Sequence, residues 1–214
     1  MKIGIIGATG HVGSHLVKAA LADNHDVTAI VRSPEKLQVS VPVLKKDLFA
    51  LTTTDLTAFD VVIDAFNAPL GKEELHQTSL LHLAKILSGT AVWLIVVGGA
   101  SSLYLSAERS KRLLDTIPAN SPIYPTASNM AQALAELKKV SNSTWTYVSP
   151  AANFIYKAPY TGKYQINKDI LEKDSAGKSE VSMADYAKGI MDLIKHPQKN
   201  IHISIAGDSS NYSA

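Results

Sequence analysis

The fold is decided by the first sixteen residues, which read MKIGIIGATGHVGSHL. They form a short apolar strand over residues 2–6, a glycine turn over residues 7–13 and a helix that we expect to open at Ser14. Such a strand, turn and helix present backbone N–H groups to a pyrophosphate. The glycines are three apart, unlike the common G-x-G-x-x-G spacing, so the context of the turn supports the interpretation. The predicted pyrophosphate-binding residues are Gly7, Ala8, Thr9, Gly10, His11, Val12 and Gly13.

Length and composition fit one globular domain over residues 1–214. The chain is 46% hydrophobic and 19% charged, and its net charge of +2 is too small to indicate a nucleic acid or a membrane surface as the main partner. It contains no cysteine, which excludes disulfides and thiolate chemistry. We see no signal peptide and expect a cytoplasmic protein. No interface pattern indicates an oligomer, and a monomer is compatible with the sequence.

Apolar strands alternate with helical segments along most of the chain. This alternation predicts an α/β fold, a Rossmann-like doubly wound parallel sheet, because parallel neighbours need a crossover connection. Residues 150–180 are expected to be rich in loops and to form a small C-terminal cap on the substrate side. The further predicted strands cover residues 26–31, 41–44, 60–65, 91–97, 144–148 and 201–206, and the longer helices cover 72–87, 126–140 and 182–195.

Ligands of open α/β sheets bind at the carboxyl ends of the strands, so the residues that follow each strand are site candidates. Arg32 and Ser33 follow the second strand, where an NAD-preferring protein carries an acidic residue. An arginine there pairs with a 2′-phosphate instead, which favours NADP(H) over NAD(H). After the third strand, Asp47 is expected to accept from the adenine amino group and Leu48 to lie on the ring. A surface acid at the start of a loop explains Asp47 equally well.

The fourth and fifth strands lead to the remaining candidates. The expected cofactor contacts there are Ala65, Phe66, Asn67, Gly98, Gly99 and Ala100. Ser101 and Ser102 follow directly and place two hydroxyls near the expected nicotinamide ring. Either hydroxyl can orient the ring or bond to a substrate carbonyl, although serine is also common in turns.

Two other sequence patterns are typical of catalytic or metal-binding sites. Tyr164 and Lys168 match the Tyr-x-x-x-Lys dyad of short-chain dehydrogenases, in which the lysine lowers the pKa of the tyrosine acid. The pair follows the sixth strand, where that dyad does not belong, so we interpret it as coincidence. This counts against alcohol or sugar oxidation. His11 and His15 have a spacing that can bind metal on a helix, but no carboxylate lies nearby in sequence, and we assign no metal.

Several stretches along nearly the whole chain carry a family resemblance. They are residues 7–13 (GATGHVG), 31–32 (VR), 96–103 (VVGGASSL), 145–150 (WTYVSP), 161–164 (TGKY) and 182–187 (SMADYA). With these the chain resembles the atypical short-chain dehydrogenases/reductases. It is most similar to the NADH-flavin reductase group, which is related to biliverdin-IX-beta/flavin reductase and to NmrA-like proteins.

The resemblance implies a reductase that transfers hydride from NAD(P)H to a flavin (FMN or riboflavin) or a quinone-like acceptor. It also implies that a serine near the end of the fifth strand, Ser101 or Ser102, takes part in the reaction. The acceptor is expected in a pocket roofed by residues 150–164. An alternative is an NmrA-like regulator that binds the dinucleotide, senses the NADP/NADPH ratio and transfers no hydride. A third interpretation, a nucleotide-sugar epimerase or reductase, is weakened by the missing dyad.

Overall fold

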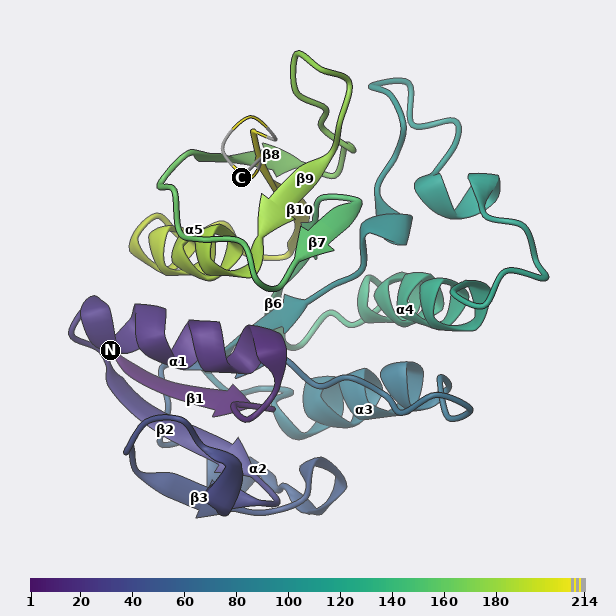
Figure 1. Cartoon of the computed structure of the whole chain (residues 1–214). Helices are drawn as coiled ribbons and strands as arrows, with labels where there is room; N and C mark the ends of the chain where they lie inside the picture. Colours follow the sequence, from purple (N-terminus) through teal and green to yellow (C-terminus); the bar gives the residue numbers. More distant parts are fainter. Residues whose placement is uncertain (209, 211, 213–214) are drawn as a thin grey trace.

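The protein is described by a computed structural model, which covers residues 1–208, 210 and 212. An eight-stranded sheet runs through the molecule in the order β3-β2-β1-β4-β5-β6-β10-β8 (Figure 1). Every neighbouring pair is parallel except β10 and β8. Its strands are β1 (Lys2–Ile6), β2 (Asp26–Val31), β3 (Val43–Lys45), β4 (Val61–Asp64), β5 (Trp93–Val97), β6 (Thr144–Pro150), β8 (Tyr164–Lys168) and β10 (Ile201–Gly207). The predicted Rossmann-like parallel sheet is confirmed.

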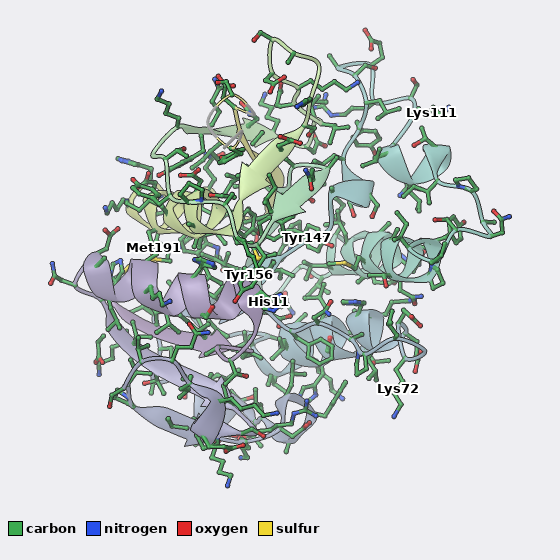
Figure 2. The ribbon with its side chains drawn as sticks, in the orientation of Figure 1. His11, Lys72, Lys111, Tyr147, Tyr156 and Met191 are labelled. Carbon is green, nitrogen blue, oxygen red and sulfur yellow. The ribbon has the colours of Figure 1, made fainter. Side chains whose placement is uncertain are left out.

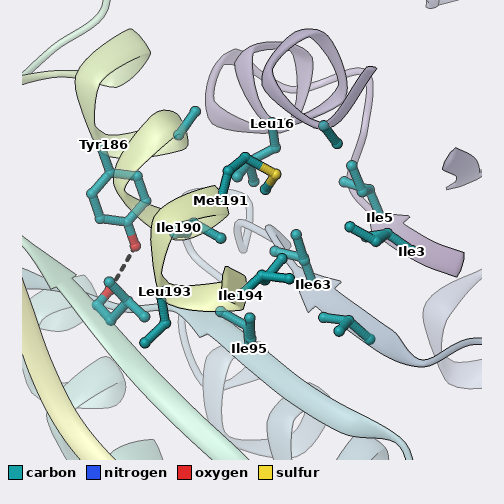
Figure 3. Close-up of a cluster of buried hydrophobic side chains, with 14 of the residues drawn as sticks. Ile3, Ile5, Leu16, Ile63, Ile95, Tyr186, Ile190, Met191, Leu193 and Ile194 are labelled. Atoms are coloured by element: carbon teal, nitrogen blue, oxygen red, sulfur yellow. Dashed lines mark hydrogen bonds between the residues drawn. The ribbon is translucent and has the colours of Figure 1, made fainter. Parts of the chain in front are cut away.

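Helices cover both faces of the sheet and bury two apolar cores. On one face α1 packs against α5, and on the other α3 packs against α4. The helices are α1 (His11–Ala22), α2 (Thr53–Leu56), α3 (Leu75–Ile86), α4 (Tyr124–Leu137) and α5 (Met183–Lys195). Figure 3 shows the core between α1, α5 and the sheet, where the Tyr186 hydroxyl donates to the Val148 carbonyl at 2.6 Å. Strands buried on both faces explain the near-continuous apolar runs in the sequence.

The first helix begins earlier than the sequence predicts. We expected it to open at Ser14, but His11 is already its first residue and Gly10 is the extended N-cap. The glycine at position 13 was assigned to the turn, yet it lies in the first helical turn, pressed against the backbone of Gly7 and Ala8. His11 and Val12 therefore lie at the positive end of a helix, which favours anions, rather than in a loop.

Residues 150–180 contain more strand than we expected. The short strand β7 (Asn153–Ile155) pairs with β9 (Glu180–Ser182), and β8 extends the main sheet. β8 is an edge strand with no fully buried residue, so it lacks the apolar run that marks the central strands. The cap is tied to α5 by the buried carboxylate of Asp185, which accepts from the backbone N–H groups of Thr161 and Gly162, both at 2.9 Å. Ser182 is the N-cap of α5, and its hydroxyl accepts from the N–H of Asp185 at 2.9 Å.

Candidate functional site

A cleft runs along the carboxyl ends of the strands and consists of two connected hollows. The first, of about 490 Å³, reaches Arg32 and Lys46 beyond β2 and β3, and we call it the β2 hollow. The second, of about 610 Å³, reaches Gly98 beyond β5 and Phe154 of the cap, and we call it the β5 hollow. Both share a middle wall formed by Thr9, Gly10, Ala65, Phe66 and Asn67. The cleft therefore crosses the ends of β1 and β4, the neighbouring strands from which the chain continues toward opposite edges of the sheet. This switch point is the ligand-binding position of the fold.

The glycine turn packs so closely on neighbouring backbone that no side chain fits at two of its positions. Gly7 has a φ of 73°, and a Cβ there would stand 2.6 Å from the Ala65 carbonyl oxygen. A Cβ on Gly13 would overlap the carbonyl oxygen of Gly7. No side chain caps the N-terminus of α1 and its first turn has no acidic residue. Its N–H groups and positive end therefore fit the pyrophosphate of a dinucleotide.

Charged side chains gather in the β2 hollow. The guanidinium of Arg32, 74% exposed, has Nη1 3.7 Å from Oδ2 of Asp47. The other Asp47 oxygen accepts from the N–H of Phe49 at 2.9 Å, so this acid caps a turn as well as facing the arginine. Lys46 binds Asp55 at 2.7 Å, and this hydrogen bond, with those from Thr52, lowers the pKa of Asp55 to about 2. Arg32 thus presents a largely exposed positive charge at the end of β2, with Asp47 as a distant partner.

Apolar side chains dominate the β5 hollow. Val97, Met130, Phe154 and Met183 line it together with Pro150, Ala151 and Ala152. Among the described lining residues, His11 is the single one with an ionisable side chain. This hollow can take a flat apolar or aromatic group, whereas the β2 hollow suits a charged one.

The floor of the β5 hollow is the backbone of Gly98 and Gly99, held from below by three buried side chains. The Gly99 N–H donates to the Tyr147 hydroxyl at 3.3 Å, and the Gly99 carbonyl accepts from Ser149 at 2.8 Å. Nε2 of His202 lies 2.9 Å from the Ser149 oxygen, and burial lowers the pKa of His202 to about 4. A neutral imidazole thus supports the floor. Gly98 must be glycine because a Cβ would enter the ring of Tyr147.

Ser101 and Ser102 do not face the cleft. They lie in the short 3-10 helix η3 (Ala100–Ser102), where they are 6% and 3% exposed. The Ser101 hydroxyl donates to the Ala127 carbonyl of α4 at 3.1 Å, and Ser102 is buried beside the hydroxyl of Tyr147. Neither is among the residues that line the β5 hollow. The geometry therefore contradicts our expectation that one of these hydroxyls meets the nicotinamide ring, because the tight turn of η3 directs both inward.

A buried polar group lies behind the middle wall. Asp64 ends β4, is 5% exposed and accepts from the N–H of Phe66 at 3.0 Å. Burial raises the pKa of this carboxyl to about 6, opposed in part by that hydrogen bond. It shares a small cavity with His76, whose pKa is lowered by burial, and with the hydroxyl of Tyr147. The hydrogen bond from Phe66 to Asp64 therefore stabilises the wall that both hollows share.

The structure brings most of the predicted cofactor residues together. The following predicted residues line the cleft: Gly7, Thr9, Gly10, His11, Val12, Arg32, Asp47, Leu48, Ala65, Phe66, Asn67, Gly98, Gly99 and Ala100. Ala8, Gly13 and Ser33 do not line it. The dyad match lies elsewhere, since Tyr164 on β8 donates its hydroxyl to Asp192 of α5.

Other lining residues were missed by the sequence analysis. Lys46, Phe49 and Lys72 belong to the β2 hollow, and Met130 and Met183 to the β5 hollow. Lys46 directly precedes Asp47, so the strand-end rule contained a signal for it. Met130 comes from the middle of α4, and nothing in its local sequence distinguishes it from a core residue.

Comparisons with known proteins agree with this geometry. The NAD(P)H-binding family matches residues 7–197. The uncharacterised protein YwnB of Bacillus subtilis (strain 168) is 41% identical over 212 residues, which cover 98% of this chain and all of YwnB. A structure from Streptococcus pneumoniae TIGR4, named "a putative NADH-flavin reductase", is 40% identical with a TM-score of 0.92 and covers 97% of this chain and all of its own.

A more distant structure shares the fold alone. It is a short-chain dehydrogenase/reductase (wide type) from Veillonella parvula in complex with NADP, with 18% identity, a TM-score of 0.70 and coverage of 99% of this chain and 96% of its own. In the described part of the chain, no helix has the length and apolar character needed to cross a membrane.

Proposed function

The chain belongs to the NAD(P)H-binding family, and from that premise we propose that it is a reductase that passes hydride from NADPH to a flavin or a quinone-like aromatic acceptor. One observation carries the proposal: a charged hollow and an apolar hollow are joined through a glycine cradle. This order matches the parts of the coenzyme, which are a phosphorylated adenosine, a pyrophosphate and a nicotinamide. The bound coenzyme supplies the hydride, and the protein supplies position and environment.

The preference for NADPH rests on Arg32. Its guanidinium lies at the end of β2, at the rim of the β2 hollow and largely exposed, where it can make charge-assisted bonds to a 2′-phosphate. An NAD-preferring protein places an acid at this point to bind the ribose 2′-hydroxyl. The nearest acid, Asp47, already caps a turn through one oxygen. Binding a phosphate would replace the long 3.7 Å Arg32–Asp47 contact with a stronger one.

The acceptor class rests on the walls of the β5 hollow. Val97, Met130, Phe154 and Met183 present apolar and polarisable surface, and thioethers pack well against aromatic rings. The name of the S. pneumoniae relative points to the same class of acceptor. A flavin or quinone takes hydride without the hydroxyl donor that must protonate the carbonyl oxygen when an alcohol dehydrogenase reduces its substrate. The inward orientation of Ser101 and Ser102 is therefore compatible with this chemistry.

The test is oxidation of NADPH, followed by its absorbance, with FMN, riboflavin and menadione as acceptors. We expect turnover with at least one of them, and faster turnover with NADPH than with NADH at subsaturating coenzyme. As a control, Phe154→Ala should raise the KM for the acceptor and leave the Kd for NADPH within about threefold, since this side chain lines only the β5 hollow.

The buried serines also favour a second candidate, a regulator that binds the dinucleotide and transfers no hydride. Neither hydroxyl is available to the cleft, and the Tyr164–Lys168 pair lies on the edge strand β8. Tight NADPH binding without turnover of any acceptor would support this regulator and contradict the reductase.

A further inference from the structure

One ionisable side chain lies in the β5 hollow. In the described lining, His11 stands among glycine, alanine, valine, methionine, phenylalanine, proline, threonine and asparagine residues, none of which titrates near neutral pH. His11 is the first residue of α1 and is solvent-exposed. Figure 2 shows it near the middle of the molecule beside Tyr156 of the cap. A histidine at this place is accessible both to a ligand in the hollow and to water.

We propose that His11 is the proton donor of the reaction, an inference that rests on the proposed reductase function. Reduction of a flavin or quinone by NADPH delivers two electrons and one proton as hydride, and the acceptor then carries an added negative charge. The imidazolium of His11 gives its proton to that anion and becomes neutral, while the coenzyme leaves oxidised. His11 regains a proton from water, so the balance is NADPH, a proton and the acceptor giving NADP+ and the dihydro acceptor.

The neighbours of His11 hold its ring without competing for the proton. Its ring stacks on Tyr156 with centroids 3.9 Å apart and planes 17° apart. His15, one turn further along α1, meets the same tyrosine edge-on at 6.1 Å. Burial and the nearby Lys18 lower the pKa of His15. The stack fixes the plane of the His11 ring at the edge of the hollow.

The charge of the bound coenzyme indicates the step at which His11 takes up its proton. His11 is the first residue of α1, at the helix end where the glycine turn would hold the pyrophosphate. A pyrophosphate bound on the same helix end places negative charge beside the ring, and an opposite charge at this range favours the protonated form. Coenzyme binding should therefore draw a proton onto His11 before the acceptor arrives. This linkage is measurable without any turnover.

The experiment is calorimetric titration of NADP+ near pH 7 in phosphate and in Tris, whose different ionisation enthalpies reveal proton uptake. We expect the wild type to take up roughly half a proton per coenzyme bound. His11→Phe keeps a ring on Tyr156 and should bind NADP+ with little or no uptake. The matched control is His15→Gln, on the same helix and against the same tyrosine but outside the hollow, which should keep the uptake. Equal uptake by His11→Phe and wild type would overturn the proposal.

A measurement on the wild-type protein tests the proposal even if the His11→Phe variant fails to fold. In histidine-edited NMR, the midpoint of the His11 titration should move up by about one pH unit when NADP+ is added, and that of His196, far along the chain at the end of α5, should stay. An unmoved His11 midpoint would also overturn the proposal.

Turnover then tests the catalytic step. With the best acceptor, the wild type should lose rate as the pH rises above neutral, and His11→Phe should be slower by roughly 100-fold at pH 6 and nearly flat with pH. A wild-type profile retained by His11→Phe would exclude His11 as the donor. If no acceptor turns over, the reductase function fails together with this role, whereas proton uptake without turnover would show that the linkage serves coenzyme sensing alone.

Discussion

The two hollows of the cleft differ in what they offer a ligand. The β2 hollow has four charged side chains at its wall, Arg32, Lys46, Asp47 and Lys72. The β5 hollow has apolar walls, a backbone floor and one histidine among its described residues. Charges select one coenzyme from another, whereas an apolar chamber excludes water from the transferred hydride and leaves the chemistry to the coenzyme. Under the proposed function, coenzyme recognition and reaction are separated along one cleft whose two hollows meet at the glycine cradle.

Breaking the cradle should disable both hollows and give the largest effect. In Gly13→Ala the new Cβ would overlap the Gly7 carbonyl oxygen, and a backbone atom cannot move aside cheaply. We expect a loss of about 3 kcal/mol of stability and at least a roughly 100-fold weaker binding of both NADPH and NADH, by denaturation and calorimetry. Gly71→Ala is the control, because its Cβ would meet nothing, although its φ of 82° will cost some stability. Unchanged coenzyme binding in Gly13→Ala would contradict the assigned cradle.

The shared wall can be tested through Asp64, whose pKa is raised to about 6 by burial. Because the folded state favours the neutral carboxyl, Asp64 is harmless below about pH 4 and lowers stability as the pH rises through 6. A shift of this size corresponds to about 3 kcal/mol at most. Asp64→Asn should therefore be more stable than wild type by about 2 kcal/mol at pH 8, with the difference shrinking toward zero at pH 4. Urea denaturation at both pH values measures it, and an equal difference at both would refute the buried, neutral carboxyl.

Removing the positive charge of Arg32 from the β2 hollow should change the preference between NADPH and NADH without changing the rate of the reaction. Arg32→Ala is expected to weaken NADPH binding by roughly 30-fold, about 2 kcal/mol, and NADH binding by less than about threefold. The rate at saturating NADPH should change little, since Arg32 lies in the β2 hollow only. Lys36→Ala, a nearby surface lysine outside the lining, serves as the control. Equal losses for both coenzymes would remove Arg32 from the 2′-phosphate.

The smallest effect is expected at the two serines. Ser101→Ala and Ser102→Ala remove buried hydroxyls that do not reach the β5 hollow, so kcat should stay within about threefold of wild type and stability should fall by about 1 kcal/mol or less. Ser149→Ala is the informative comparison, because Ser149 holds the carbonyl of Gly99 in the hollow's floor. A loss of kcat by 100-fold or more in Ser101→Ala or Ser102→Ala would restore a catalytic serine.

Strand ends were predictable from the sequence, and with them most of the cleft. Gly7, Arg32, Asp47 and Phe66 follow apolar runs, and parallel strands bring such positions to one edge. The direction in which a side chain points after the strand was not predictable. At Ser101 a single 3-10 turn rotates the hydroxyl toward α4, a detail decided by packing rather than by residue type.

The sequence also could not predict which residues of distant segments line the cleft. Met130 reaches the cleft from the middle of α4, and Met183 from the first turn of α5. In both cases an apolar residue has the same local pattern whether it joins a core or lines a hollow. Edge strand β8 was overlooked for the related reason that two of its five residues are exposed and the other three are only partly buried.

The central claim is that the cleft binds a nicotinamide coenzyme with its phosphorylated adenosine in the charged hollow. Its most direct test is calorimetric titration of the wild-type protein with NADPH, NADH and 2′,5′-ADP. The account predicts one site per chain, tighter binding of NADPH than of NADH, and measurable binding of 2′,5′-ADP that is lost in Arg32→Ala. No binding of either reduced coenzyme would contradict it.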